Sequence, residues 1–541
     1  MNENILITFT DLNFNYYLNM ETREKTLRDT TAMRWFVLVL LSALIFATYW
    51  YQDFYSGLKA LMESELKFTS EEFGRLIGLT TIANMFGMII VGGIVLDKWG
   101  IRLAGLVFGG LAAFGAAISA MATAGFFGHS HSTMLTMMIV GRVMFGSGLE
   151  ITCVVATRTI VKWFKGYEIA LALAINIGFG RLGSALGIAV SPDIANGHVS
   201  PAVTFAATLV ALALILFLLY TFFDKKLDKQ RAGTIEDTSA TDEEFKLGDL
   251  VKLATNPSFI FIALLCVSFY AAVFPFIQYA PDLLVNKFGF TYILPDDPHS
   301  NIILFGSKAI GNTSVFIVLF IFGLAFSLVP ANIKERAHKN LSMFVIFVLF
   351  LGFVYMLKDT FRLWFTNGPK TASLIPLGTI LFTPIFGSYV DRKGKAASLM
   401  ILGSLLLIFA HLSLSLVNIK LLAYIGLFCL GIAFSLVPAA MWPSVAKIVP
   451  ENRLGTAYAS MFTVQNWGLG LFFWGIGAIL DLANKSNLAD IRAGKMPYDY
   501  TIPIFVLVFC GVIAIFLAFK LKQADKKQGY GLEQPSVKNG D

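Results

Sequence analysis

Two ionisable residues, Glu150 and Arg181, lie deep inside long apolar segments that a short basic turn at 162–165 joins. At a helical rise of about 1.5 Å per residue, Glu150 lies about 18 Å from Lys162 and Arg181 about 22 Å from Gly166, so both are expected near mid-membrane. A charge there costs roughly 2.5 to 3.5 kcal/mol even on lenient insertion scales. Both side chains must therefore face a protein interior or a wet cavity.

An acid and a base at one depth favour two kinds of chemistry. The pair could form a permanent salt bridge that holds the two helices together. Alternatively, the charges could meet the two ends of a zwitterionic ligand. A zwitterion about two extended residues long has its charged ends roughly 5 to 7 Å apart, a distance that opposite charges on facing helices can span. We favour the zwitterion and assign the ammonium to Glu150 and the carboxylate to Arg181.

Further polar residues in apolar segments are candidate contacts of the same ligand. Arg142 precedes Glu150 by eight residues on one broad helix face, where it could pair with Glu150 or contact the ligand. Asp53 is expected about 28 Å along the first span from Arg34, toward the outer mouth, where it could bind ligand or a proton. Amphipathic or amide side chains that could line the cavity, or serve only as packing and interhelical contacts, are Tyr51, Tyr270, Gln278, Gln465 and Asn466.

The composition indicates that membrane spans position these residues. Of the 541 residues 56% are hydrophobic and 14% charged, and the mean hydropathy is +0.70, so we expect a polytopic protein in a lipid bilayer. The net charge of +7 comes from Lys and Arg that flank apolar segments, which argues against nucleic-acid binding. The four cysteines lie in apolar segments, and no metal, cofactor or catalytic set is visible. We therefore expect neither a cofactor nor an enzyme.

Fourteen apolar segments are long enough to cross about 30 Å of hydrocarbon. A cytoplasmic tail (1–33) precedes an N-terminal six-helix bundle (34–223), a cytoplasmic linker (224–256), a C-terminal bundle (257–521) and a second cytoplasmic tail (522–541). The insertion 286–370 within the C-terminal bundle carries two extra runs, and twelve spans with a re-entrant pair is the alternative. The predicted spans are 34–59, 71–96, 101–127, 133–161, 166–192, 201–223, 257–284, 314–331, 341–357, 372–390, 397–417, 421–445, 455–481 and 501–521.

A short loop motif occurs once in each half of the chain. Gly-Ile-Val-Leu-Asp-Lys-Trp-Gly at 93–100 returns as Gly-Ser-Tyr-Val-Asp-Arg-Lys-Gly at 387–394, each after the second core span of its half. Duplicated six-helix bundles are typical of transporters. We expect the two loops to act as a cytoplasmic latch, with a simple tight turn as the alternative. The gating candidates are Gly93, Asp97, Lys98, Gly100, Arg102, Gly387, Asp391, Arg392 and Gly394.

The doubled loop resembles the signature of the major facilitator superfamily, and the Gly-Arg-x-x-x-Gly-x-x-x-Glu run at 141–150 resembles its fourth-helix motif. Four blocks resemble the lysosomal dipeptide transporter branch: WFKG at 163–166, RLGS at 181–184, AVFPFI at 272–277 with KFGF at 287–290, and LGTAY at 454–458 with QNWG at 465–468. This resemblance implies facilitated diffusion of dipeptides, with Glu150 and Arg181 at the peptide's two ends. The insertion and the long acidic linker depart from the pattern.

These observations predict an all-α major facilitator fold that transports small peptides by alternating access, as a uniporter. One alternative is a proton-coupled symporter of peptides, amino acids or small organic anions, in which Glu150 or Asp53 carries the proton. A second alternative is a membrane sensor or scaffold that does not transport. We expect a bacterial inner membrane, with the lysosomal membrane as the alternative, and the sequence leaves an accessory subunit open.

Overall fold

The structure is a computed structural model of the 541-residue chain and describes residues 26–231, 247–333, 335–450 and 453–535. Most of the predicted N-terminal tail, the acidic stretch of the predicted linker and the last residues of the C-terminal tail lie outside these ranges.

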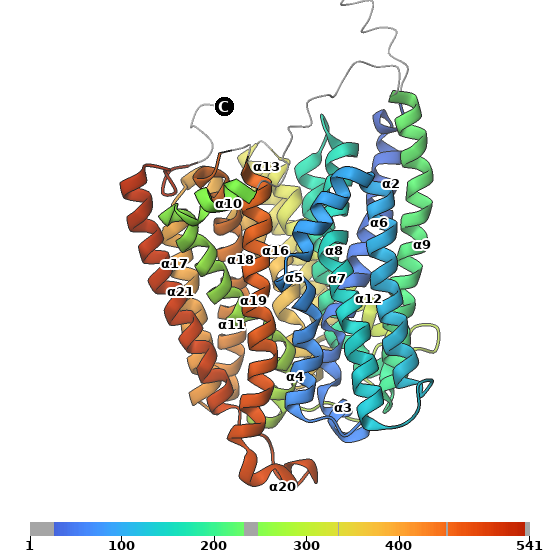
Figure 1. Ribbon diagram of the computed structural model, residues 1–541. Helices are drawn as coiled ribbons and strands as arrows, with labels where there is room; N and C mark the ends of the chain where they lie inside the picture. The colour runs from blue at the N-terminus through green and yellow to red at the C-terminus, as the bar shows by residue number, and fades with distance from the viewer. Residues whose placement is uncertain (1–25, 232–246, 334, 451–452, 536–541) are drawn as a thin grey trace, which may run out of the picture.

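Two helical bundles lie side by side, with the N-terminal bundle in blue to green and the C-terminal bundle in green to red (Figure 1). Helices are the expected solution for these apolar runs because lipid offers no partner for backbone N–H and C=O groups. No strand is assigned among the described residues, which contain two isolated bridges. The expected all-α polytopic fold is confirmed.

The N-terminal bundle begins with η1 (Leu27–Asp29). It continues with α2 (Thr31–Asp53), η2 (Phe54–Leu58), α3 (Lys59–Glu65), α4 (Ser70–Gly78), η3 (Leu79–Thr81), α5 (Ile82–Met85), α6 (Met88–Thr123), α7 (His131–Phe164), α8 (Ile169–Ala195) and α9 (Val199–Arg231).

The C-terminal bundle follows a short amphipathic helix, α10 (Leu247–Ala254). Both ends of the described chain lie at one end of the molecule, here called the inner end, and α3, α4 and α20 lie at the opposite, outer end (Figure 1). The helices of this bundle are α11 (Pro257–Phe288), α12 (Lys308–Ala331), α13 (Arg336–Met356), α14 (Lys358–Trp364), α15 (Gly368–Ala372), α16 (Leu374–Lys393), α17 (Ala396–Leu416), α18 (Lys420–Ile448), α19 (Leu454–Ala483), η5 (Lys485–Asn487), α20 (Leu488–Arg492) and α21 (Thr501–Gln528).

Thirteen helices of the described chain are long and apolar enough to cross a membrane, one fewer than expected. The difference lies in α6, which is interrupted at Gly100, where φ is 76° and ψ 170°. The predicted second span ends at this break and the predicted third begins there. The second span is itself divided into α4, η3, α5 and the start of α6, with Gly87 at φ 85° between the last two.

The first predicted span, 34–59, is not continuous either. α2 ends at Asp53, and the chain continues through the 3₁₀ segment η2 into α3. The end of a helix in general leaves backbone carbonyls without intrahelical partners, so other donors must satisfy them in an apolar environment.

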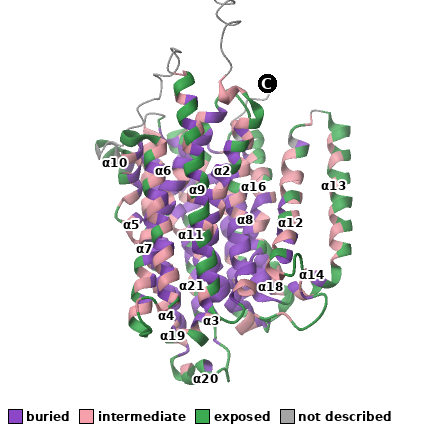
Figure 2. Ribbon diagram, turned by 90° about the vertical axis from the view of Figure 1, so that its right-hand side faces the viewer, coloured by how far each residue is buried: buried purple, intermediate pink, exposed green. Residues whose placement is uncertain are grey.

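The predicted insertion contains α12 and α13. α12 packs on α8 and α16, whereas α13 packs mainly on α12 and has no buried residue. Figure 2 shows α13 standing apart from the bundle, beside α12.

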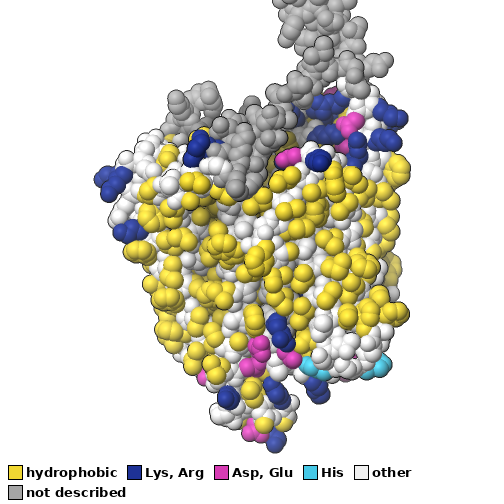
Figure 3. Space-filling model, viewed as in Figure 1, with side chains coloured by type: hydrophobic (Ala, Val, Ile, Leu, Met, Phe, Trp, Pro, Cys, Tyr) yellow, Lys and Arg dark blue, Asp and Glu magenta, His cyan; other side chains and the backbone are white. Residues whose placement is uncertain are grey.

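Hydrophobic side chains cover the middle of the visible face of the molecule, and charged side chains gather toward its two ends (Figure 3). An apolar middle band between charged ends is the surface expected of a protein that spans a bilayer.

Candidate functional site

Glu150 on α7 and Arg181 on α8 are both half-buried. Within the described chain, Glu150 has no hydrogen bond and no ion pair, and the two residues do not form a salt bridge with each other. The permanent ion pair that the sequence left open is therefore absent from this conformation. Two opposite charges in the middle of a helical bundle remain available to a ligand.

Tyr49 on α2 lies in the neighbourhood of both charges, and its hydroxyl lies near the thiol of Cys153, which follows Glu150 by one helical turn. A Cβ on Gly180 would lie 3.2 Å from the Tyr49 ring, so the ring also rests on α8. Tyr49 therefore contributes a polar tip at the place where α2, α7 and α8 meet.

The position of Arg181 depends on a close approach between α8 and α2. A Cβ on Gly183 would lie 2.2 Å from the carbonyl oxygen of Phe46, so glycine is required at this contact. Ser184, one residue later, donates a hydrogen bond to the carboxylate of Asp53. These contacts fix the turn of α8 that carries Arg181.

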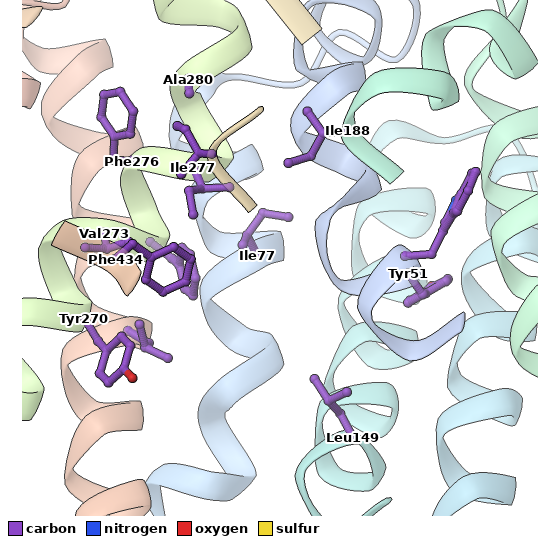
Figure 4. Packing of buried hydrophobic residues seen from close by; sticks show 14 of the residues in the cluster. Tyr51, Ile77, Leu149, Ile188, Tyr270, Val273, Phe276, Ile277, Ala280 and Phe434 are labelled. Atoms are coloured by element: carbon purple, nitrogen blue, oxygen red, sulfur yellow. The ribbon is translucent and has the colours of Figure 1, made fainter. Parts of the chain in front are cut away.

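Arg181 reaches the opposite bundle through an aromatic ring. Its guanidinium carbon lies 4.6 Å from the ring centroid of Phe434 on α18, and Phe434 packs against Phe274 with a centroid distance of 5.3 Å. Figure 4 shows Phe434 beside Val273, with Tyr270 below them. Tyr270 stacks on Phe274 and accepts a 3.0 Å hydrogen bond from the indole of Trp442. The C-terminal bundle thus presents an aromatic wall to Arg181.

Asp53 lies at the end of α2, where it is 4% exposed. Besides the bond from Ser184, its carboxylate accepts a 2.7 Å hydrogen bond from the side-chain amide of Gln278 on α11. Asp53 also interacts electrostatically with Arg181. Asp53 therefore links the N-terminal bundle to the C-terminal bundle, and it does so close to Arg181, the residue expected to bind the ligand's carboxylate.

Arg142 is fully buried and donates hydrogen bonds to backbone carbonyls near the end of α2. Its Nη1 donates to the carbonyl of Tyr51 at 2.8 Å, its Nη2 to that of Gln52 at 3.3 Å, and its Nε to the hydroxyl of Thr80 at 2.9 Å. Neither of the two roles considered for it, partner of Glu150 or ligand contact, fits these bonds. A guanidinium is needed here because it can satisfy several orphan carbonyls at once.

The remaining candidates make local contacts. Tyr51 packs in an aromatic group with Phe54 and Phe145, whose ring centroids lie 5.2 and 4.4 Å away. The thiol of Cys266 donates to the side-chain oxygen of Gln465 at 3.5 Å, which joins α11 to α19. The Asn466 amide donates to the Phe462 carbonyl at 2.9 Å, and its own buried oxygen has no partner in the described chain.

A second polar network, which the sequence did not single out, joins the two bundles at the outer end. The ammonium of Lys59, fully buried, lies 2.8 Å from Asp282 and 2.7 Å from Glu63. Asp282 also accepts hydrogen bonds from Tyr292, at 2.6 Å, and Tyr500. Ser56 donates to the Ile277 carbonyl at 2.8 Å beside this network. Charges near the ends of the apolar runs were the available signal, but they resemble ordinary boundary charges.

The two loop motifs make different contacts. In the first, Asp97 pairs with Arg158 of α7, and Arg102 pairs with Asp224 at 3.1 Å and Asp228 at 2.6 Å, while Lys98 is exposed. In the second, Asp391 and Arg392 are exposed and form no ion pair within the described chain. The C-terminal tail docks directly after this motif: the backbone N–H groups of Lys395 and Ala396 donate to the backbone carbonyls of Glu533 and Leu532.

The four motif glycines also differ. Gly394 (φ 71°) could not carry a Cβ without approaching the backbone of Gln534 to 2.4 Å, whereas Gly93, Gly387 and Gly100 have open space around them. No group of three or more His, Cys, Asp or Glu residues suited to a metal ion occurs among the residues that the structure describes.

Comparisons with known proteins identify the family of this chain. The Major Facilitator Superfamily model matches residues 38–369 and 371–537. The chain is 26% identical over 458 residues to a lysosomal dipeptide transporter MFSD1 from Danio rerio, covering 82% of this chain and 80% of that protein. It is 25% identical over 470 residues to a human protein of the same name, with 83% and 80% covered.

Solved structures show the same fold. A D-xylose-proton symporter has a TM-score of 0.57 at 13% identity, covering 91% of this chain and 97% of its own. The xylose transporter XylE from E. coli, in a partially occluded inward-open conformation, has a TM-score of 0.56 at 12% identity, with 91% and 98% covered.

Proposed function

Because this chain belongs to the major facilitator superfamily and is therefore a multi-pass membrane transporter of a small molecule, we propose that its substrate is a dipeptide and that it transports by alternating access as a uniporter. The observation that carries this proposal is that Glu150 and Arg181 lie on neighbouring helices, α7 and α8, and form no salt bridge with each other within the described chain. A zwitterion supplies both missing partners at once, because its ammonium meets the carboxylate and its carboxylate meets the guanidinium.

The curated relatives support the same substrate class, since they carry the name lysosomal dipeptide transporter. The lysosomal location in these names also favours a lysosomal membrane over the bacterial inner membrane expected from the sequence. Side-chain selectivity is expected to be broad, because Arg181 faces an aromatic wall on α18, a helix whose sequence contains no acidic residue.

In the proposed cycle, the substrate enters while the bundles are apart on one side and binds between Glu150 and Arg181. Arg181 already touches the C-terminal bundle at Phe434, so a ligand that binds Arg181 also influences how the two bundles meet. For the cavity to open at the outer end, the ion pair between Lys59 and Asp282, which joins the two bundles there, must break.

The test is uptake of a labelled dipeptide into liposomes that contain the purified protein, compared with Glu150→Gln and Arg181→Ala. Loss of one charged hydrogen bond, about 1.5 to 3 kcal/mol, is expected to lower uptake at limiting substrate roughly 10- to 100-fold in each variant. Lys485→Ala, which removes an exposed charge on η5, is the matched control. Normal uptake by either site variant would refute the clamp.

A second candidate function, proton-coupled symport, is favoured by Asp53. This buried acid lies between the bundles and interacts with Arg181, which is a suitable place for a carried proton. Uptake with and without an inward proton gradient separates the two candidates. If the gradient drives accumulation and Asp53→Asn abolishes that effect, symport replaces uniport.

A further inference from the structure

The inserted helices enclose a pocket that the transport function leaves unexplained. It has a volume of about 570 Å³ and lies between α12, α13, α14 and α16. Seven phenylalanines, Trp364 and four leucines line most of it. This volume falls within the range of small-molecule sites. Because α13 has no buried residue and stands apart from the bundle (Figure 2), the pocket opens toward the membrane rather than toward the transport path.

The depth of the pocket matches one leaflet of a bilayer. Its lining runs along α12 from Phe316 to Phe326 and along α15 and α16 from Thr371 to Leu381. Ten residues of helix correspond to about 15 Å, which is half of the about 30 Å hydrocarbon thickness. It begins at the outer end, at α14, and ends near mid-membrane.

The lining residues argue against a helix of another protein as the occupant. Transmembrane helices pack through small residues that let backbones approach closely. Here two glycines, Gly323 and Gly378, stand among bulky aromatic side chains. A spanning helix would also need the full thickness of the bilayer rather than half of it.

The outer rim supplies positive charge. Lys358 and Arg362 on α14 are exposed, as is Asp359, so this helix carries a net charge of +1, and it lines the pocket through Phe361 and Trp364. Cations beside an apolar crevice complement a phosphate group that is attached to a hydrocarbon chain.

We propose that this pocket is a binding site for a glycerophospholipid of the outer leaflet, with one acyl chain between α12, α13 and α16 and the phosphate beside α14. The lipid fills the crevice that separates α13 from the bundle. One lining residue, Lys370, connects the pocket to α8. Its ammonium nitrogen lies 5.0 Å from the ring centroid of Trp364 and 2.8 Å from the carboxylate of Asp193 on α8.

The test uses the full chain in liposomes of phosphatidylcholine doped with a phosphatidylcholine whose acyl chain carries a photoreactive diazirine. Labelled peptides are mapped by mass spectrometry. We expect labelling in the pocket-lining peptides of α12, α13 and α16 that is lost in Gly378→Leu. A Cβ at Gly378 has its nearest neighbour 4.0 Å away, so the added side chain fills the pocket without a backbone clash.

Gly352→Leu is the matched control, because Gly352 lies on α13 with open space around it and does not line the pocket. If Gly378→Leu fails to elute as a folded monodisperse protein, Phe350→Trp narrows the pocket from the opposite wall. Labelling that persists in the filled pocket, labelling restricted to the outer faces of the helices, or cross-links from a second protein chain to this lining would each overturn the proposal.

Discussion

At the scale of single residues, the contrast between Arg142 and Arg181 separates two uses of a buried cation. Arg142 donates hydrogen bonds to the carbonyls of Tyr51 and Gln52 and to the hydroxyl of Thr80. These bonds to the fold itself compensate the burial of its charge. Arg181 is held by a ring stack and by the position of its helix, and Glu150 lacks a hydrogen-bonding partner within the described chain. A charge that the fold leaves unsatisfied at mid-depth is the expected mark of a ligand site.

The ring beneath Arg181 leads to a prediction for Phe434→Leu. Removing the cation–π contact, worth about 0.5 to 2 kcal/mol, frees the guanidinium and is expected to raise the KM for dipeptide roughly 2- to 30-fold while the protein remains folded. Uptake kinetics in liposomes measure this. The control is Phe428→Leu, an exposed phenylalanine on the same helix. An unchanged KM would mean that the stack does not position Arg181.

The sequence was sufficient to single out Glu150 and Arg181, because a charge within an apolar run is costly wherever the helices lie. It was insufficient for Arg142. Its partners are carbonyls exposed by a break at Asp53, and nothing in the residues of 34–59 marks that break. Phe434 was likewise hidden among many aromatic residues, since its role depends on which helices meet.

At the scale of elements, the end of α2 is stabilised by one side chain from α7. We predict that Arg142→Met lowers the melting temperature in detergent strongly, because two buried carbonyls lose a charged donor, with each such bond worth about 1.5 to 3 kcal/mol. Arg158→Met is the matched control, since Arg158 forms an exposed pair with Asp97 that is expected to contribute at most about 1 kcal/mol. Equal effects of the two substitutions would contradict this role.

The docked C-terminal tail gives a pH-dependent prediction. Partial burial acts to raise the pKa of Glu533, but hydrogen bonds from Ser398 and the charge of Lys522 outweigh it and hold the pKa below its usual value. Since the folded pKa is the lower one, the stabilisation is present above the unfolded pKa of about 4.3 and is lost as the pH falls through the folded pKa.

Glu533→Gln is therefore expected to lower the melting temperature at pH 7 and to have a smaller effect as the pH drops below about 4. Thermal unfolding in detergent across this range measures the difference. Asp490→Asn, in the exposed pair with Lys495, is the control. An effect of Glu533→Gln that does not change with pH would show that the carboxylate charge is not what holds the tail.

Most helices could be predicted from hydropathy, because runs of about 20 apolar residues have no other stable conformation in lipid. The irregular parts could not. Gly87 interrupts apolar sequence within the predicted span 71–96, and the position of α13 apart from the bundle depends on packing that composition does not record. Docking of residues 531–534 on the second loop also escaped prediction, because the tail carries no apolar pattern of its own.

At the scale of the whole molecule, the two bundles are joined at the outer end by Ser56, Lys59 and Asp282 and near the site by Asp53 and Gln278. Rocking requires these contacts to separate. We predict that a disulfide between Ser56→Cys and Ile277→Cys abolishes uptake and that reduction restores it. A pair within one bundle, Ser119→Cys with Met138→Cys, is the control, because Ser119 already bonds to the Met138 carbonyl at 3.4 Å. Full uptake with the outer disulfide formed would contradict alternating access through this contact.

In the proposed site, Glu150 meets the ammonium and Arg181 the carboxylate of one dipeptide. Inhibition of dipeptide uptake by N-acetylated and C-amidated analogues, in the wild type, Glu150→Gln and Arg181→Lys, tests this assignment. Acetylation is expected to weaken inhibition of the wild type roughly 10- to 100-fold and to have little further effect in Glu150→Gln, because the lost contact is the same one. Full additivity of acetylation and Glu150→Gln would refute the assignment, since it would place the ammonium elsewhere.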